Sequence, residues 1–361
     1  MIWLAVKKLI YGIIMKAKKR MDWTVKPRYI NFLITYKCNG RCMMCDIWKR
    51  YRNNKEQAKE ELTLEEIRNF LERDKPFLSE LRHIGLTGGE PFLREDLVEI
   101  IRTIRRILPR TTTGPQTNGL FPELIKERLK EIKEFYPEVG LAVSLDGIGE
   151  THDRIRGVKG AFGKAIKTIE YAKELGIENI TCGMTILSSN HDQILKVAKL
   201  VESCECEFSC FLPDSSYYFY NPDKSYNLAD KQRKEVIREL KHFFYHYYMD
   251  NLRLQLEGER KKTFSCYSGY TSIVIDPYGN VVPCILRSEI MGNIKEKPLK
   301  EIMYGKKAKE IRKKLRNCTC WNQCEVTTSA MIDFFGVLKW FLRCPGKKKF
   351  LKKIALRKNR F

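Results

Sequence analysis

The chain has 361 residues, a formal net charge of +23 at pH 7 and thirteen cysteines. This length allows one large α/β domain with a smaller appendage and a sizeable core. A secreted disulfide scaffold, which would be short and rich in loops, is excluded. The cysteines instead indicate a reducing, cytoplasmic compartment and metal binding.

Most of the positive charge lies at the two ends of the chain. Residues 1–21 hold six Lys or Arg and residues 334–361 hold ten, with no acidic residue in either segment, so the rest of the chain carries a net charge of only +7. This distribution favours an anionic membrane surface over nucleic acid as a partner.

Both ends also contain the apolar residues of an interfacial helix. Residues 1–15 are apolar over too short a stretch to span a bilayer, and no signal-peptide cleavage site follows them. The other interpretation is that both ends are helices packed on the protein's own surface. We expect basic amphipathic segments at residues 1–28 and 331–361.

Between these ends, apolar stretches of strand length alternate with amphipathic helices. A capping box from Thr63 to Glu66 opens the first such helix. Six alternations predict a parallel sheet with helices outside it, although periodicity alone does not separate a barrel from an open sheet. The predicted strands are residues 29–35, 81–87, 111–117, 140–145, 179–187 and 206–212, and helices begin near residues 63, 96, 123, 162 and 191.

The pattern changes beyond residue 228. Residues 229–249 predict one long helix, within a linking segment at 229–262, whose Phe and Tyr residues indicate packing. A cysteine-rich appendage follows at residues 263–330. It contains a predicted β-hairpin, with strands at 271–275 and 281–282.

Cys38, Cys42 and Cys45 follow the first predicted strand at C-x3-C-x2-C spacing. Three thiolates this close together suit a soft metal site, and a four-iron cluster bound by only three of them leaves one iron open to a ligand. The alternative is a disulfide or a zinc ion, although zinc sites usually use two separate pairs of ligands.

Further polar residues follow the next strands. Gly88 and Gly89 let the backbone approach a ligand, and Glu90 can accept hydrogen bonds from an ammonium group. Asn118 and Ser144 offer hydrogen bonds of the kind that a ribose needs, and the planar donor group of Arg156 suits a carboxylate. The alternatives are a glycine turn, a turn-capping Asn, a buried Ser and a surface Arg.

In order and spacing, the cysteine triplet and residues 88–91, 117–119 and 144–147 resemble the radical S-adenosylmethionine (radical SAM) enzymes, over residues 29–325. The resemblance implies a partial (β/α)6 TIM-like barrel at residues 29–228, with a [4Fe-4S] cluster on the three cysteines. S-adenosylmethionine would bind the open iron, with its amino group at Glu90. The implied reaction is reductive cleavage to a 5'-deoxyadenosyl radical, which abstracts hydrogen from a carbon of the substrate. One departure, Met44 in place of an aromatic residue, puts little in doubt.

The appendage resembles the SPASM/twitch domains of these enzymes, including its Gly292-Asn293-Ile294 segment. A full SPASM region has seven cysteines for two clusters, whereas this chain has five here and only Cys344 beyond them, which favours one auxiliary [4Fe-4S] cluster. A zinc ion is the alternative. The expected ligands are Cys266, Cys284, Cys320 and Cys324, with Cys318 as a substitute.

The remaining cysteines are ambiguous. Cys204, Cys206 and Cys210 would point to one face of a strand and could bind a ligand, but cysteines on a buried strand are more often small apolar fillers. Cys182 is interpreted in the same way. Tyr217, Tyr218 and Cys210 are candidates, by position only, for quenching a product radical.

The auxiliary cluster would assist oxidation or bond formation. The amphipathic ends favour a membrane-associated substrate such as a lipid or lipid-linked sugar. The 28 residues before the first strand disfavour a leader-peptide-binding domain. A peptide- or protein-modifying maturase and an RNA-modifying enzyme are the alternatives. We expect electrons from an acidic ferredoxin or flavodoxin that docks on a basic surface, and a cytoplasmic protein held at the inner face of the membrane.

Overall fold

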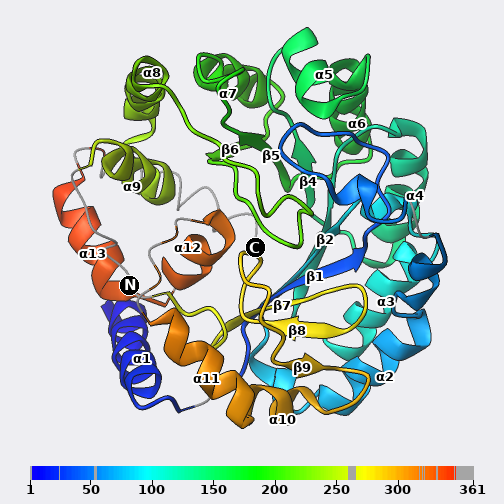
Figure 1. The fold of residues 1–361 in the computed structure, drawn as a ribbon, viewed down its shortest axis with the longest axis vertical. Coiled ribbons are helices and arrows are strands. Elements are labelled where there is room, and N and C mark those ends of the chain that lie inside the picture. Colours follow the sequence, from blue (N-terminus) through cyan, green and yellow to red (C-terminus); the bar gives the residue numbers. More distant parts are fainter. Residues whose placement is uncertain are drawn as a thin grey trace.

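Six parallel strands in sequential order form the centre of the molecule (Figure 1). The computed structural model describes residues 2–23, 25–52, 55–258, 266–316, 318, 320, 322–330, 332–344 and 346. Each strand lies within two residues of its predicted limits, and all except β3, whose sequence is Thr-Thr-Gly-Pro-Gln-Thr, are locally apolar stretches. The strands are β1 (Tyr29–Thr35), β2 (His83–Gly88), β3 (Thr112–Thr117), β4 (Leu141–Ser144), β5 (Ile180–Thr185) and β6 (Glu207–Phe211).

Helices between successive strands cover the outer face of this sheet, which gives the partial barrel that the sequence predicts. The predicted capping box is confirmed: Thr63 N donates to Glu66 Oε2 at 2.9 Å, and Glu66 N donates to Thr63 Oγ1 at 3.2 Å. The helices are α2 (Leu64–Asp74), α3 (Leu97–Ile107), α4 (Pro122–Phe135), α5 (Glu150–Arg156), α6 (Ala161–Glu174) and α7 (Ile194–Ser203). The sequence did not predict α5, which is short and mostly polar.

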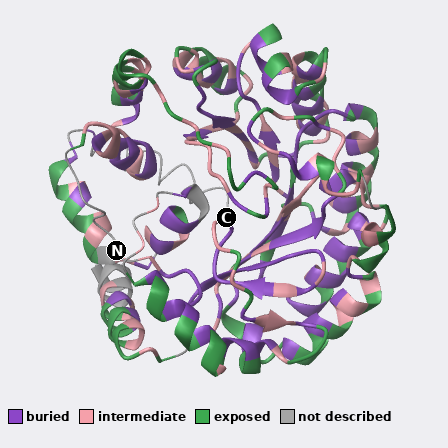
Figure 2. Ribbon diagram, in the orientation of Figure 1, coloured by how far each residue is buried: buried purple, intermediate pink, exposed green. Residues whose placement is uncertain are grey.

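One apolar core lies between the sheet and these helices, and the buried strands run through its middle (Figure 2). Ile100, Ile101 and Ile104 of α3 are fully buried against it. Burial of one such side chain stabilises the fold by about 1.5–3 kcal/mol. The functional loops at the strand ends are therefore attached to a rigid support.

The C-terminal hairpin continues the same sheet. β7 (Ser272–Ile275) lies parallel to β1, and β8 (Asn280–Val282) and β9 (Gly292–Asn293) follow in antiparallel order, giving nine strands in all. The predicted hairpin is confirmed. Its turn is fixed by Asp276, whose Oδ1 accepts hydrogen bonds from Tyr278 N and Asn280 N, both at 2.9 Å. The pairing of β7 with β1 was not predicted.

The single helix predicted at residues 229–249 is wrong. The structure has α8 (Asp230–Leu240), a short 3-10 helix at Lys241–Phe243, and α9 (Tyr247–Leu256). The break falls at His246, whose backbone is extended and whose side chain accepts a hydrogen bond from Met249 N, so that it caps a new helix. The aromatic residues pack as predicted, since Phe243 and Tyr248 are buried in the core.

The two ends of the chain form helices that lie next to each other, α1 (Ile2–Arg20) and α13 (Phe334–Arg343) (Figure 1). Met15 of α1 is buried with Val25, Tyr267 and Ile332. None of the helices in the described part of the chain has the length and apolar character needed to cross a membrane. The remaining helices of the C-terminal region are α10 (Leu299–Tyr304), α11 (Lys306–Leu315) and α12 (Gln323–Ala330).

Candidate active site

The three cysteines of the first motif lie in the loop that follows β1. A Cβ atom on Gly40 would lie 3.4 Å from Cys42 Sγ and 3.7 Å from Cys38 Sγ, so both sulfurs flank the same glycine. Burial raises the pKa of Cys38 and of Cys45 to about 12, and the neighbouring Cys42 thiol adds to both shifts. Such thiols need a bound cation to become thiolates at neutral pH.

Three thiols within eight residues form the donor set of this loop. In an iron-sulfur cluster each thiolate binds a different iron. The donor set and its spacing therefore fit a cluster.

A buried ion pair lies against the cysteine loop. Arg156, at the end of α5, pairs with Asp146 (Nη2 to Oδ2, 2.6 Å) and donates from Nη1 to Cys42 Sγ at 3.5 Å. Burial opposes the charge of Arg156, but Asp146 and Cys42 outweigh it and raise the pKa of the guanidinium. Its Nε is buried and has no hydrogen-bond partner in the described part of the chain. One donor of Arg156 is thus left for a ligand.

The two glycines after β2 allow two backbones to approach each other closely. A Cβ on Gly88 would lie 2.2 Å from the Thr35 carbonyl oxygen, and one on Gly89 would lie 2.0 Å from that of Lys37. Gly89 N and Glu90 N donate to these same oxygens, both at 2.7 Å. The sequence predicted an approach to a ligand, whereas the structure has these glycines against the cysteine loop itself.

Glu90 connects the ends of β2 and β3. Its buried carboxylate accepts hydrogen bonds from Phe92 N at 3.2 Å and from Asn118 N at 2.7 Å. Burial raises the pKa of Glu90 to about 7, although these two hydrogen bonds oppose the shift. At neutral pH the carboxylate is therefore balanced between its two protonation states.

Asn118 also reaches the cysteine loop. Its Nδ2 donates to Asn39 Oδ1 at 2.7 Å and lies 3.8 Å from Cys38 Sγ, while its Oδ1 accepts from Leu120 N. Asn118 therefore caps a turn, as the alternative interpretation expected, and it also contacts the cysteine loop, while its hydrogen bond to a ribose stays a prediction. Ser144 is half-buried at the end of β4.

A segment after β6 covers the other side of the cysteine loop. Asn221 Nδ2 and the Tyr226 hydroxyl both donate to the Met44 carbonyl, at 2.6 and 2.8 Å. Cys45 Sγ lies 3.8 Å from the Phe219 carbonyl, and Lys224 pairs with Asp46 at 2.9 Å. Sequence reasoning missed these residues, since nothing in the local pattern relates them to a loop more than 170 positions away.

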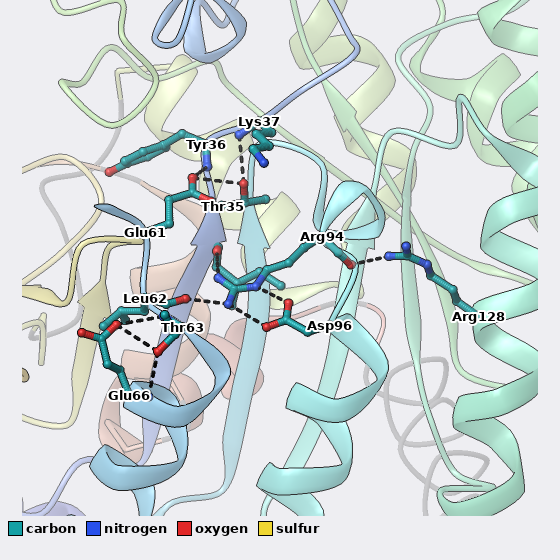
Figure 3. Close-up of polar contacts among 11 residues, drawn as sticks. Thr35, Tyr36, Lys37, Glu61, Leu62, Thr63, Glu66, Arg94, Asp96 and Arg128 are labelled. Atoms are coloured by element: carbon teal, nitrogen blue, oxygen red, sulfur yellow. Dashed lines mark hydrogen bonds and ion pairs between the residues drawn. The ribbon is translucent and has the colours of Figure 1, made fainter. Parts of the chain in front are cut away.

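The start of the cysteine loop is held by two charged side chains (Figure 3). Glu61 Oε1 accepts hydrogen bonds from Tyr36 N at 2.6 Å and from Thr35 Oγ1 at 3.1 Å. Arg94 donates to the carbonyls of Ile34 and Leu62, both at 2.6 Å, and is itself fixed by its ion pair with Asp96. The loop thus leaves β1 at a fixed angle.

A cleft of about 570 Å³ opens beside Cys38. Four cationic residues, Lys37, Arg41, Arg52 and Lys55, line it together with Trp48 and Tyr51. Among the described residues that line it, none is acidic. The cleft is therefore suited to an acidic molecule.

The second group of cysteines lies around the C-terminal hairpin. Cys284, two residues after β8, is buried, which raises the pKa of its thiol, and Glu325, Cys266 and Cys318 are close enough to add to the shift. Cys266 Sγ lies 3.1 Å from Ser268 Oγ, which donates a short hydrogen bond to Glu325. Cys266 and Cys318 therefore lie within electrostatic range of Cys284.

The other cysteines of the C-terminal region differ in position. Cys320 is half-buried, and Cys324 belongs to α12 with a side chain outside the described residues. Cys344 is the C-cap residue of α13, directly after Arg343, and its thiol donates to the Phe244 carbonyl.

Cys204 and Cys206 lie between α7 and β6, so the prediction that they share one face of a strand with Cys210 is wrong. Cys182 and Cys210 are fully buried in the core, and Cys204 and Cys206 pack against it at partial exposure. Of the proposed radical-quenching residues, Tyr218 is buried in an apolar cluster with Tyr36 next to Cys38 and Cys45, whereas Tyr217 is exposed. Cys210 lies in the main core instead.

Two family models match the chain. Residues 32–201 match the radical SAM superfamily, and residues 266–325 match an iron-sulfur cluster-binding domain of the SPASM type. Together they cover the loop of the first three cysteines and the second group of cysteines. The cofactors are therefore S-adenosylmethionine, the iron-sulfur cluster of the core and an auxiliary iron-sulfur cofactor bound by the C-terminal domain.

Several named proteins are similar to the chain in sequence. It is 26% identical over 272 residues to the antilisterial bacteriocin subtilosin biosynthesis protein AlbA of Bacillus subtilis, covering 74% of this chain and 57% of AlbA. It is 26% identical over 298 residues to the sporulation killing factor maturation protein SkfB of the same organism, covering 81% and 69%. The AdoMet-dependent heme synthase of Methanosarcina barkeri is 25% identical over 328 residues, covering 81% and 86%.

Solved structures share the fold. Streptococcus suis SuiB bound to its precursor peptide SuiA has a TM-score of 0.63 at 18% identity, covering 88% of this chain and 73% of SuiB. The structure of anSMEcpe with bound AdoMet has a TM-score of 0.61 at 17% identity, covering 90% and 99%. The chain is an enzyme that belongs to the radical SAM superfamily and carries a C-terminal SPASM domain.

Proposed function

We propose that this enzyme modifies a peptide or protein substrate by hydrogen abstraction from carbon. The observation that carries the proposal is its similarity to AlbA and SkfB, which extends over 74% and 81% of the chain. Their names assign them to the biosynthesis of the bacteriocin subtilosin and to the maturation of sporulation killing factor. A lipid or lipid-linked sugar, which the sequence favoured, has no support from the fold or from these relatives.

Cys38, Cys42 and Cys45 would hold the [4Fe-4S] cluster of the core. When bound, the cluster and S-adenosylmethionine supply a 5'-deoxyadenosyl radical that abstracts hydrogen from a carbon atom. Glu90, in its ionised form, would accept the methionine ammonium group. Arg156 would offer its unpartnered Nε to the methionine carboxylate.

The surrounding residues position these groups and exclude water. Asp146 orients Arg156 through their 2.6 Å ion pair, and Asn118 contacts both Asn39 and the Cys38 sulfur. Asn118 and Ser144 would donate to the ribose. Asn221 and Tyr226 hold the Met44 carbonyl and so limit movement of the loop between Cys42 and Cys45.

One auxiliary cluster would be held by Cys266, Cys284 and Cys318, with a further thiolate from Cys320 or Cys324. Cys318 was expected only as a substitute, but its electrostatic contribution at Cys284 supports it as a full member of the set. Iron analysis tests this set. Cys284→Ala should lower the iron content by roughly four atoms per chain, as expected for one [4Fe-4S] cluster, whereas Cys182→Ala in the core should leave it unchanged.

The direct test is an assay of the anaerobically reconstituted protein with S-adenosylmethionine, dithionite and candidate precursor peptides encoded beside its gene. We expect 5'-deoxyadenosine together with a peptide that has lost hydrogen atoms, as read by mass spectrometry. Cys42→Ala should abolish both products. Modification of components of a lipid extract, with every peptide left unchanged, would overturn the proposal.

A further inference from the structure

The outer face of α1 is apolar. At about 100° of turn per residue, Ile10, Ile13, Ile14 and Ala17 lie along one side of the helix, and Met21, the first residue after it, continues that line. All five are exposed, Ile10 by 51% and Met21 by 50% of their surface. An exposed apolar stripe of this length is unusual on a soluble protein and marks a binding surface.

The exposure of this stripe follows from how α1 is attached. The opposite side of the helix holds Gly12 and Met15, which are buried. Immediately after the helix, Asp22 pairs with the fully buried Arg312 (Oδ1 to Nε, 3.0 Å) and accepts from the Tyr270 hydroxyl at 3.1 Å. The helix is therefore fixed to the protein by its inner side, and its outer stripe has to face away.

Cationic residues border the stripe. At about 100° of turn per residue, Lys16 and Arg20 lie along one side of it and Lys18 along the other. Lys16 and Arg20 are exposed, and α1 contains no acidic residue. Trp23, just beyond the helix, is exposed by 58%. An indole with an apolar ring and a polar N–H is the side chain that membrane–water interfaces favour.

The neighbouring α13 repeats the arrangement. Phe335, Leu338 and Leu342 are exposed at a spacing that places them on one side of that helix, with Lys339 and Arg343 beside them. Exposed residues of both helices lie at the same edge of the molecule (Figure 2). Residues 334–361 contain ten Lys or Arg and no acidic residue.

We propose that α1, with α13 beside it, docks on the surface of an anionic lipid bilayer. The apolar stripe would enter the boundary between headgroups and acyl chains, and the bordering Lys and Arg would contact anionic headgroups. A partner protein or a second copy of this chain would need acidic groups to match the cations. In a second copy, neither α1 nor α13 contains an acidic residue. The proposal is independent of the substrate.

Vesicle co-sedimentation of the full-length protein tests the docking. We expect binding to vesicles of phosphatidylcholine with phosphatidylglycerol, and binding to pure phosphatidylcholine that is about tenfold weaker. Ile13→Glu/Ile14→Glu should weaken binding to the anionic vesicles by at least about tenfold. Ile290→Glu, at an exposed isoleucine outside both helices, is the matched control and should bind like the unaltered protein.

A charge-reversal pair separates electrostatic from apolar attraction. Lys16→Glu/Arg20→Glu should weaken binding to anionic vesicles and reduce its salt dependence, since the other cations of α1 and α13 remain. Lys75→Glu/Lys130→Glu, which changes two exposed lysines elsewhere by the same charge, should not. Retained formation of 5'-deoxyadenosine would show that each variant is folded.

Two results would overturn the proposal. One is unchanged binding of the Ile13→Glu/Ile14→Glu protein to anionic vesicles. The other is absence of vesicle binding by the unaltered protein combined with a stripe-dependent dimer in analytical ultracentrifugation, because the stripe would then be an interface between copies of the chain.

Discussion

A carboxylate with a pKa near 7 is the residue-scale feature with the clearest consequence. Glu90 is enclosed between the ends of β2 and β3, and its burial raises its pKa to about 7 even though two backbone N–H groups donate to it. An incoming ammonium group favours the ionised carboxylate. Binding of S-adenosylmethionine should therefore be linked to the ionisation of Glu90.

We predict that affinity for S-adenosylmethionine rises with pH. Below the pKa of about 7 most Glu90 side chains are protonated and cannot pair with an ammonium group, whereas above it most are ionised. Between pH 6 and pH 8 the ionised fraction grows about tenfold, so the dissociation constant should fall by about the same factor. Anaerobic equilibrium dialysis of the cluster-loaded protein measures it.

The control for this prediction is Glu90→Gln, which keeps the shape of the side chain and removes the titration. Its affinity should be weak and independent of pH in the same range. If the affinity of Glu90→Gln for S-adenosylmethionine still changed with pH, the titration would belong to another group, and Glu90 would not be the acceptor of the ammonium.

At the scale of the element, the exit of β1 is held by Arg94. This side chain donates to two backbone carbonyls, those of Ile34 and Leu62, and pairs with Asp96. We predict that Arg94→Gln lowers the free energy of unfolding by about 2–3 kcal/mol, since hydrogen bonds to a charged group are lost and buried carbonyls are left without a partner. Thermal unfolding and iron content, measured together under anoxic conditions, check this.

The matched control is Arg102→Gln on α3, whose ion pair with Glu99 is exposed to solvent. Such a pair contributes little, so unfolding temperature and iron content should stay at the values of the unaltered protein. If the two variants behaved alike, Arg94 would have no special part in holding the cysteine loop.

The elements differ in how well the sequence predicts them, for physical reasons. Strands β1, β2, β4, β5 and β6 were predicted because their apolar stretches are local and bounded by turn residues, whereas β3 has no such stretch. The break at His246 was missed, because it depends on a side chain that accepts from Met249 N in place of a helical hydrogen bond. The pairing of β7 with β1 joins segments more than 240 residues apart, so the sequence of neither segment indicates it.

Some features of the candidate site could likewise be predicted from the sequence, and others could not. The cysteine spacing and the polar residues after the strands could be predicted, since parallel strands bring their carboxyl ends to one edge. The contacts of Asn39 and Asn221 could not, because an asparagine in a loop has many possible partners. Arg156 was predicted as a ligand for a carboxylate; in the structure Nη1 and Nη2 contact Cys42 and Asp146, and Nε is the guanidinium nitrogen without a partner in the described part of the chain.

At the scale of the whole molecule, we predict that an acidic electron donor docks at the cationic cleft beside Cys38. We predict that Arg52→Glu slows formation of 5'-deoxyadenosine about tenfold when reduced flavodoxin is the donor at low salt, because an acidic donor would meet a like charge. With dithionite, a small reductant that needs no docking surface, the rate should be unchanged. Single-turnover assays with the two reductants measure both rates.

Arg110→Glu provides the comparison, since Arg110 is exposed just before β3, at the amino end of the strands rather than the carboxyl end. Its rate should be unchanged with either reductant. A loss of rate with dithionite in Arg52→Glu would indicate damage to the cluster and not to docking.

The pairing of β7 with β1 has a consequence for the two iron sites. The loop of Cys38, Cys42 and Cys45 leaves the end of β1, and Cys284 lies two residues beyond β8, which pairs with β7. The register joins Tyr29 with Ser272 and Phe32 with Ile275, and a slip by one residue would shift a strand by about 3.3 Å and turn its side chains to the opposite face. The distance that an electron would travel between the two sites is therefore set by backbone hydrogen bonds and not by a hinge.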